Sequence, residues 1–228
     1  KDLTYKDGET TGMNMNFNSN GQLYNLRNYK NGTLDGFWEY YHGNGQLEER
    51  GNYKNGKRDG FWEKYYENGY LRERGNYKNG KEDGLWEWFH KTGGKSTENY
   101  KNGKLDGFSE LFNENGQVED RENYKDGKED GLSEWFDENG QLEEKGNYKN
   151  DELDGLLEWF YENGQLKVRQ HHKNGKEDGL WEYYYENGQL ERRGNWKNGW
   201  FEDGLWEYFD KEGNLTKTEE WKDGELIE

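Results

Sequence analysis

The sequence predicts an all-β protein: an elongated antiparallel meander of β-hairpin repeats of about 24 residues each, in a single-layer twisted or curved sheet. The first observation is a period in the positions of one glycine, which follows Asp in every repeat except the first. Successive gaps between these glycines are 24, 24, 24, 23, 24, 24, 24 and 25 residues. A fixed period in this range indicates a repeat architecture, in which each repeat contacts only its neighbours. The marker glycines are Gly12, Gly36, Gly60, Gly84, Gly107, Gly131, Gly155, Gly179 and Gly204.

The second observation is the alternation of strand and turn signals inside one repeat. Residues 37–41 are rich in aromatic side chains and favour a strand, and residues 43–46 form a Gly- and Asn-rich turn signal. Residues 47–54 form a second alternating segment, and residues 55–60 a second turn. No apolar period of 3.6 residues runs long enough for a helix. Two strands and two turns per repeat predict an antiparallel meander.

We expect residues 1–228 to form a single repeat array. Residues 1–23 are interpreted as an N-terminal capping unit, residues 24–210 as consensus repeats, and residues 211–228 as a C-terminal cap.

The composition limits the classes of partner. The net charge of −17 repels nucleic-acid phosphates and anionic lipid headgroups, so we expect no nucleic acid and no membrane insertion. Hydrophobic residues make up only 28% of the chain, but aromatic residues make up 17% and recur at fixed positions, which argues against disorder. With no cysteine, disulfides and thiolate metal sites are excluded.

One motif recurs along the chain, as Tyr-Lys-Asn-Gly-Lys-x-Asp-Gly-x-Trp-Glu-x-Tyr-x-Glu-Asn-Gly-Gln-Leu, best seen in residues 53–71, 77–89 and 148–166. This motif resembles the MORN repeat, specifically the bacterial variant found in proteins often labelled antitoxin-like. The resemblance implies β-hairpin repeats, association with proteins or membranes, and no catalytic residues.

Three columns of repeated apolar residues are predicted to form the core, because a repeat cannot bury its apolar face alone. The first stands five residues after the marker glycine: Phe17, Tyr41, Tyr65, Phe89, Phe112, Phe136, Phe160, Tyr184 and Phe209. The second is Tyr5, Tyr29, Tyr53, Tyr77, Tyr100, Tyr124, Tyr148, His172, Trp196 and Trp221. The third is Leu23, Leu47, Leu71, Val118, Leu142, Leu166, Leu190 and Leu215.

Two further columns have predicted structural roles. Glu recurs three residues after the marker, as in Glu39 and Glu63, and is interpreted as a structural ladder, with a catalytic or metal-binding row as the alternative. Gly51 and its equivalents are predicted to let a neighbouring ring lie over the backbone.

A broken column of Trp and other aromatic residues is predicted to lie on the opposite face, partly exposed, as a binding surface. The alternative is a second core face. The candidate binding residues of this aromatic stripe are Trp38, Tyr40, Trp62, Trp86, Trp88, Trp135, Trp159, Trp181 and Trp206.

Departures from the consensus are a second set of candidate binding residues: His90, His171, His172 and Trp200. Each is either a local binding device or drift of the sequence. The four histidines are too scattered for a metal cluster, and no catalytic constellation is present, so we expect no metal, no cofactor and no enzyme.

These observations predict a non-enzymatic repeat scaffold that binds a protein partner, which its charge suggests is cationic. We expect a monomer and a bacterial surface, secreted or antitoxin-like protein; a cytoplasmic location is the alternative. The alternative function is a carbohydrate-, choline- or cell-wall-binding repeat array, because aromatic rings stack on sugars and cage choline.

Overall fold

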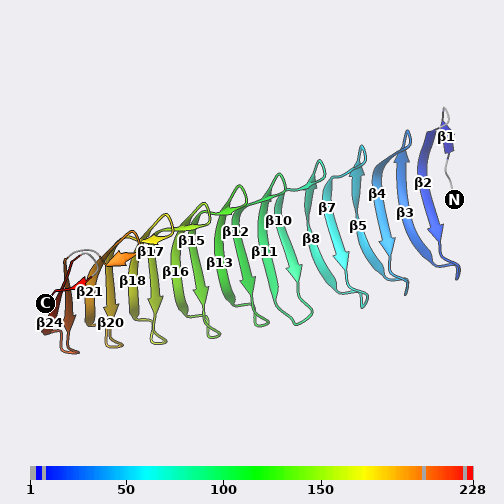
Figure 1. The fold of residues 1–228 in the computed structure, drawn as a ribbon. Helices are drawn as coiled ribbons and strands as arrows, with labels where there is room; N and C mark the ends of the chain where they lie inside the picture. Colours follow the sequence, from blue (N-terminus) through cyan, green and yellow to red (C-terminus); the bar gives the residue numbers. More distant parts are fainter. Residues whose placement is uncertain (1–3, 7–8, 202–203, 223–224, 228) are drawn as a thin grey trace. The chain divides into compact units, whose positions relative to one another are not determined.

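The computed structural model describes residues 4–6, 9–201, 204–222 and 225–227. It divides into two compact units: the first contains Lys1–Gly107 and Asn113–Gly116, and the second contains Phe108–Phe112 and Gln117–Glu228. Strands and turns account for the regular structure of the described residues, and none of them is helical (Figure 1). The all-β prediction is therefore confirmed.

Each unit is an open meander of hairpins, in which successive strands pair antiparallel; β4 pairs with β5, and β5 pairs in turn with β7. The strands of the first unit are β1 (Thr4–Lys6), β2 (Glu9–Phe17), β3 (Leu23–Lys30), β4 (Thr33–Tyr41), β5 (Leu47–Lys54), β6 (Lys57–Arg58), β7 (Gly60–Tyr65), β8 (Leu71–Lys78), β9 (Lys81–Glu82), β10 (Gly84–Phe89) and β11 (Lys95–Lys101). The division between the units falls within β12 (Lys104–Phe112). The strands of the second unit are β13 (Val118–Lys125), β14 (Lys128–Glu129), β15 (Gly131–Phe136), β16 (Leu142–Lys149), β17 (Glu152–Phe160), β18 (Leu166–Lys173), β19 (Lys176–Glu177), β20 (Gly179–Tyr184), β21 (Leu190–Lys197), β22 (Trp200–Phe201), β23 (Gly204–Phe209), β24 (Leu215–Lys222) and β25 (Glu225–Leu226).

The marker glycines recur because their backbone is left-handed. Gly36 has a φ of 110° and Gly60 a φ of 80°, and a side chain is strained at such angles. The Asn-Gly turns have the same requirement, since Asn55 and Gly56 have φ values of 49° and 75°. The Asp before the marker supports the turn of the next hairpin, because the Asp35 carboxylate accepts a 3.1 Å hydrogen bond from the amide of Asn55.

A β-bulge sets the register of the hairpins. In β4 and β5, Trp38 lies opposite Gly51, and the register shifts between Tyr40 and Tyr41. The same shift occurs in the β7–β8 hairpin and at the matching position of hairpins in the second unit. The β10–β11 hairpin pairs through to Phe89 and Lys95 without it. The single 23-residue gap of the period is therefore a hairpin that has lost its bulge residue.

The core lies on the face of the sheet that carries Trp62 and the other residues two positions after a marker glycine, which is called the Trp face below. This corrects the prediction that the column five residues after the marker forms the core. Six buried apolar side chains are described, and all except Leu26 stand two residues after a marker glycine: Trp62, Trp86, Leu157, Trp181 and Trp206. In the column predicted as core, Phe17 is 57% exposed and the other eight members are half-buried. The predicted tyrosine column does join the core, because Tyr53 packs edge-on against Trp62 at a ring separation of 5.2 Å.

Three of the four buried indoles lie directly on a glycine of the preceding strand, whereas Trp181 has Gln170 at that position. A Cβ on Gly51 would stand 2.2 Å from Trp62, and one on Gly75 would stand 2.2 Å from Trp86. The same holds for Gly194 and Trp206, at 2.1 Å. Trp62 also donates a 3.2 Å hydrogen bond from Nε1 to the carbonyl of Asn52. The prediction that these glycines allow a ring to lie over the backbone is confirmed.

The opposite face carries a ladder of ion pairs between strands. Arg50 pairs with Glu63, and Arg74 pairs with Glu87, each at 2.5 Å. Each guanidinium also lies over an aromatic ring of the next repeat, at 5.9 Å for Arg50 over Tyr65. The structural interpretation of the glutamate column is supported, with arginine as its principal partner. The aromatic column five residues after the marker is a platform for these cations.

We predict that Gly51→Ala destabilises the protein by about 1–3 kcal/mol, because the new methyl group overlaps the Trp62 indole. The measurement is the urea midpoint of unfolding. Gly43→Ala is the matched control, since a Cβ added there would meet nothing within 4 Å, and its midpoint should stay unchanged. Equal losses in the two variants would contradict the packing described here.

Candidate functional site

The aromatic stripe divides into buried and half-buried members. Trp62 is 1% exposed, Trp86 3%, Trp206 4% and Trp181 7%, so the expectation of a partly exposed surface is wrong for these four rings. The remaining members are half-buried: Trp38, Tyr40, Trp88, Trp135 and Trp159. Only these five can present part of a ring to a ligand, and their role in binding stays a prediction.

The repeat departures are scattered over the sheet. His90 is exposed and begins the turn between β10 and β11. His171 and His172 are neighbours on β18 and point to opposite faces. His172 takes a place in the tyrosine column, 6.0 Å from the ring of Trp181, and burial lowers the pKa of its imidazole. Trp200 lies in β22, and its side chain lies outside the described residues.

Two of the predicted site residues meet at a hollow of about 390 Å³ at the turn end of the Trp face. Trp88 and His90 line it together with residues from the neighbouring hairpin. The full lining is Tyr66, Arg72, Glu73, Trp88, Phe89, His90, Ser96 and Glu98. Sequence reasoning missed the polar members. The signal that could have located them is Ser96. It pairs with Trp88 across the β10–β11 hairpin, at the position where the β7–β8 hairpin has Glu73.

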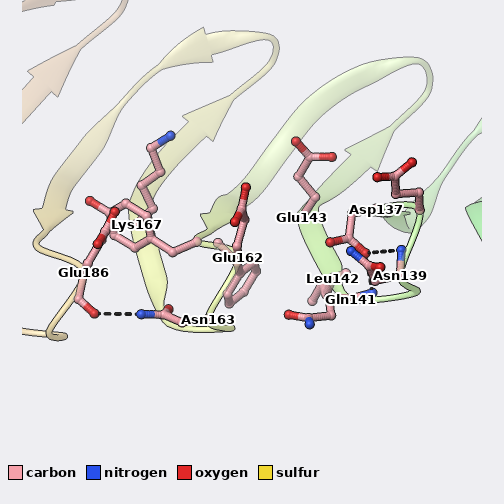
Figure 2. A pocket seen from close by; sticks show the side chains of 12 residues that line it. Asp137, Asn139, Gln141, Leu142, Glu143, Glu162, Asn163, Lys167 and Glu186 are labelled. Carbon is pink, nitrogen blue, oxygen red and sulfur yellow. Dashed lines mark hydrogen bonds between the residues drawn. The ribbon is translucent and has the colours of Figure 1, made fainter.

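A wider hollow of about 940 Å³ lies in the second unit, between the turns that follow β15 and β17 (Figure 2). In neighbouring repeats a tyrosine bridges successive hairpins, as Tyr161 does with a 2.7 Å hydrogen bond to the carbonyl of Tyr184. Asp137 stands at this tyrosine position and accepts hydrogen bonds from its own turn instead. The hollow is acidic, because its lining contains one lysine, Lys167, and five carboxylates, those of Asp137, Glu138, Glu143, Glu162 and Glu186.

The break in the Trp column leaves a polar cluster in the second unit. Ser133 replaces the indole and is fully buried, with its hydroxyl donating to Glu129. Burial and, to a smaller extent, the nearby carboxylates of Glu122 and Glu129 together raise the pKa of Asp120 to about 6. Burial likewise raises the pKa of Glu129. The loss of one large ring therefore places partly buried carboxyl groups in the core face.

Within the described ranges, no group of three or more histidine, aspartate or glutamate side chains is arranged to hold a metal ion. A search of the same residues for a helix long and apolar enough to cross a membrane also gave none.

The fold and its repeating contacts define a class: a repeat protein of antiparallel hairpins, which in several repeats stack through a Trp, a Tyr and a Gly. Six segments match the model of the MORN repeat variant, and together they cover more than half of the chain: residues 34–55, 58–79, 129–150, 153–174, 177–198 and 202–223. The chain belongs to the MORN repeat variant family. MORN repeats are commonly protein- or membrane-binding modules and form a non-catalytic repeat family.

Other comparisons add little. No curated protein matches the chain. A solved structure described as TcdB2-TccC3-Cdc42 is similar over 91% of this chain and 13% of that one, with 11% identity and a TM-score of 0.23. At that score the similarity carries no argument.

We predict that Asp120→Asn stabilises the protein at pH 7.5 and has no effect at pH 4. The native state holds the Asp120 proton more tightly than the unfolded chain between pH 3.8 and about 6, so the stability contributed by this group falls as pH rises through that window. The expected gain is on the order of 1 kcal/mol, reduced because solvent screens this half-exposed group. Urea unfolding at both pH values measures it.

Glu138→Gln is the control, because Glu138 is exposed at a turn. A gain of the same size in this variant, or a gain from Asp120→Asn that persists at pH 4, would contradict the assignment.

Proposed function

We propose that the chain is a non-enzymatic scaffold that binds a protein partner through the face that carries the ion-pair ladder. The observation that supports this is a row of apolar side chains directly after the marker glycines, most of them exposed; Leu156 and Leu180 are the half-buried members. In the first unit, Phe37 is 40% exposed, Phe61 48% and Leu85 49%. In the second unit, Leu132 and Leu205 are 40% and 57% exposed. The family's common role in binding proteins is consistent with the proposal.

The spacing of this apolar row suits an extended contact. Two strands per repeat at about 4.8 Å each place successive members roughly 10 Å apart. The neighbouring arginines are also accessible, since the side chain of Arg50 is 44% exposed and that of Arg74 is 41% exposed. Apolar anchors beside arginine are typical of the core of protein interfaces. The half-buried rings of the stripe remain additional candidates.

The charge of the chain favours a partner with a cationic or mixed surface. The net charge is −17, and the acidic hollow of Figure 2 concentrates carboxylates at one place in the second unit. Complementary charge speeds encounter and selects partners more than it adds affinity. We place the protein, as a monomer, at a bacterial surface or in secretions, or as an antitoxin-like binder; a cytoplasmic location is the alternative. The proposal includes neither binding to nucleic acid nor insertion into a membrane.

We predict that the triple variant Phe37→Ser, Phe61→Ser and Leu85→Ser lowers capture of the partner at least tenfold. Each side chain is exposed, so the urea midpoint should change little. The measurement is affinity capture from extract of the source cells, quantified by mass spectrometry. Tyr70→Ser is the control, because Tyr70 is 73% exposed at a turn away from the row. Equal capture by all three baits would overturn the apolar row as the binding surface.

A further inference from the structure

We propose that the hollow beside Trp88 is a binding site for a neutral sugar, a function separate from the protein-binding face proposed above. Trp88 lies on the Trp face of the sheet, whereas the exposed apolar row lies on the other. The hollow is lined by the aromatic rings of Tyr66, Trp88 and Phe89 and by several hydrogen-bonding groups. Its volume of about 390 Å³ lies within the usual range for small-ligand sites.

The hollow exists because two features coincide at one hairpin. Trp88 lies between Glu73 on one neighbouring strand and Ser96 on the other. Ser96 is small, and the β10–β11 hairpin lacks the bulge residue that the β7–β8 hairpin has next to its turn. Space is therefore left at the edge of the indole, where a longer side chain would otherwise lie.

The equivalent rings of the second unit provide a contrast. Trp159 lies between Glu144 and Val168, and its Nε1 donates a 2.8 Å hydrogen bond to the Glu144 carboxylate. Trp135 lies between Asp120 and Glu144. Both rings have larger neighbours than Ser96. Trp88 thus has the smallest neighbour of these three rings, and it lines the hollow described above.

The charges that line the hollow are of both signs, and one of the two carboxylates is already ion-paired, which favours a neutral ligand over an ion. Glu73 is paired with Lys64 at 2.6 Å and with Arg72 at 3.3 Å. Glu98 accepts a 2.5 Å hydrogen bond from the hydroxyl of Tyr100. A cation placed here would compete with these partners, and an anion would face both carboxylates.

The same groups retain capacity for hydroxyl ligands. An ionised carboxylate has about four lone-pair sites, and a guanidinium has five N–H donors, so Glu73, Glu98 and Arg72 can each form a further hydrogen bond. The Ser96 hydroxyl and the His90 ring, 3.4 Å apart, add a donor and an acceptor. A sugar ring offers C–H groups to the face of an indole and hydroxyls to its surroundings. This combination of aromatic rings and both hydrogen-bond types matches a pyranose.

The test is a titration of the uniformly ¹⁵N-labelled chain, read at the tryptophan indole N–H resonances, with Trp88 assigned from Trp88→Phe. The probes are maltose, cellobiose, N,N′-diacetylchitobiose, choline and arginine amide. We expect at least one disaccharide to shift the Trp88 resonance saturably, with a Kd of about 1 mM, while choline and arginine amide leave it in place. Ser96→Val, which copies the neighbour of Trp159, should weaken this binding at least tenfold.

Trp159→Phe is the matched control and should leave the titration unchanged. The proposal is overturned if no disaccharide moves Trp88, if Ser96→Val binds as well as the native chain, or if only choline or arginine amide binds. The triple variant of the apolar row keeps this hollow intact. A failure here and a failure of the protein-binding proposal are therefore distinguishable.

Discussion

The packing of an indole on a glycine of the preceding strand is the interaction on which the rest of this structure depends. A single layer of hairpins has few aliphatic side chains with which to build a core, and Trp62, Trp86 and Trp206 are each buried by lying flat on the backbone of a glycine. A Cβ added at Gly75 would lie 2.2 Å from Trp86. At Gly146, where Leu157 replaces the indole, the closest approach relaxes to 3.1 Å. The close contact is thus specific to repeats that pair Trp with Gly.

The two faces of the sheet consequently have different roles. The Trp face holds the repeats together, and the opposite face carries arginine–glutamate pairs and, in most repeats, an exposed apolar side chain. Binding sites are expected where the repetition is interrupted or where it leaves apolar groups uncovered. The hollow at Trp88 follows from a small residue and a missing bulge, and the acidic hollow follows from Asp137 at a tyrosine position.

The sequence predicted the hairpin meander and its turns because Asn and Gly at fixed offsets specify backbone angles locally. It also predicted the role of Gly51, because a glycine inside a strand often marks a place where another group approaches the backbone closely. It did not predict which face is buried. The bulge at Tyr41 shifts the register, so Gly51 and Tyr53 face Trp38 and Gly36 rather than the column of Tyr41. The polar lining at Trp88 comes from separate strands and could not be read from local spacing.

A double-mutant cycle between Gly75 and Trp86 tests the central claim most directly. The variants are Gly75→Ala, Trp86→Leu and the double variant, and the measured quantity is the free energy of unfolding in urea. If the indole rests on the glycine, Gly75→Ala is costly beside Trp86 and nearly neutral beside leucine, with a coupling energy of about 1 kcal/mol or more. If Gly75→Ala costs the same in both backgrounds, the glycine serves the strand for another reason and the account is contradicted.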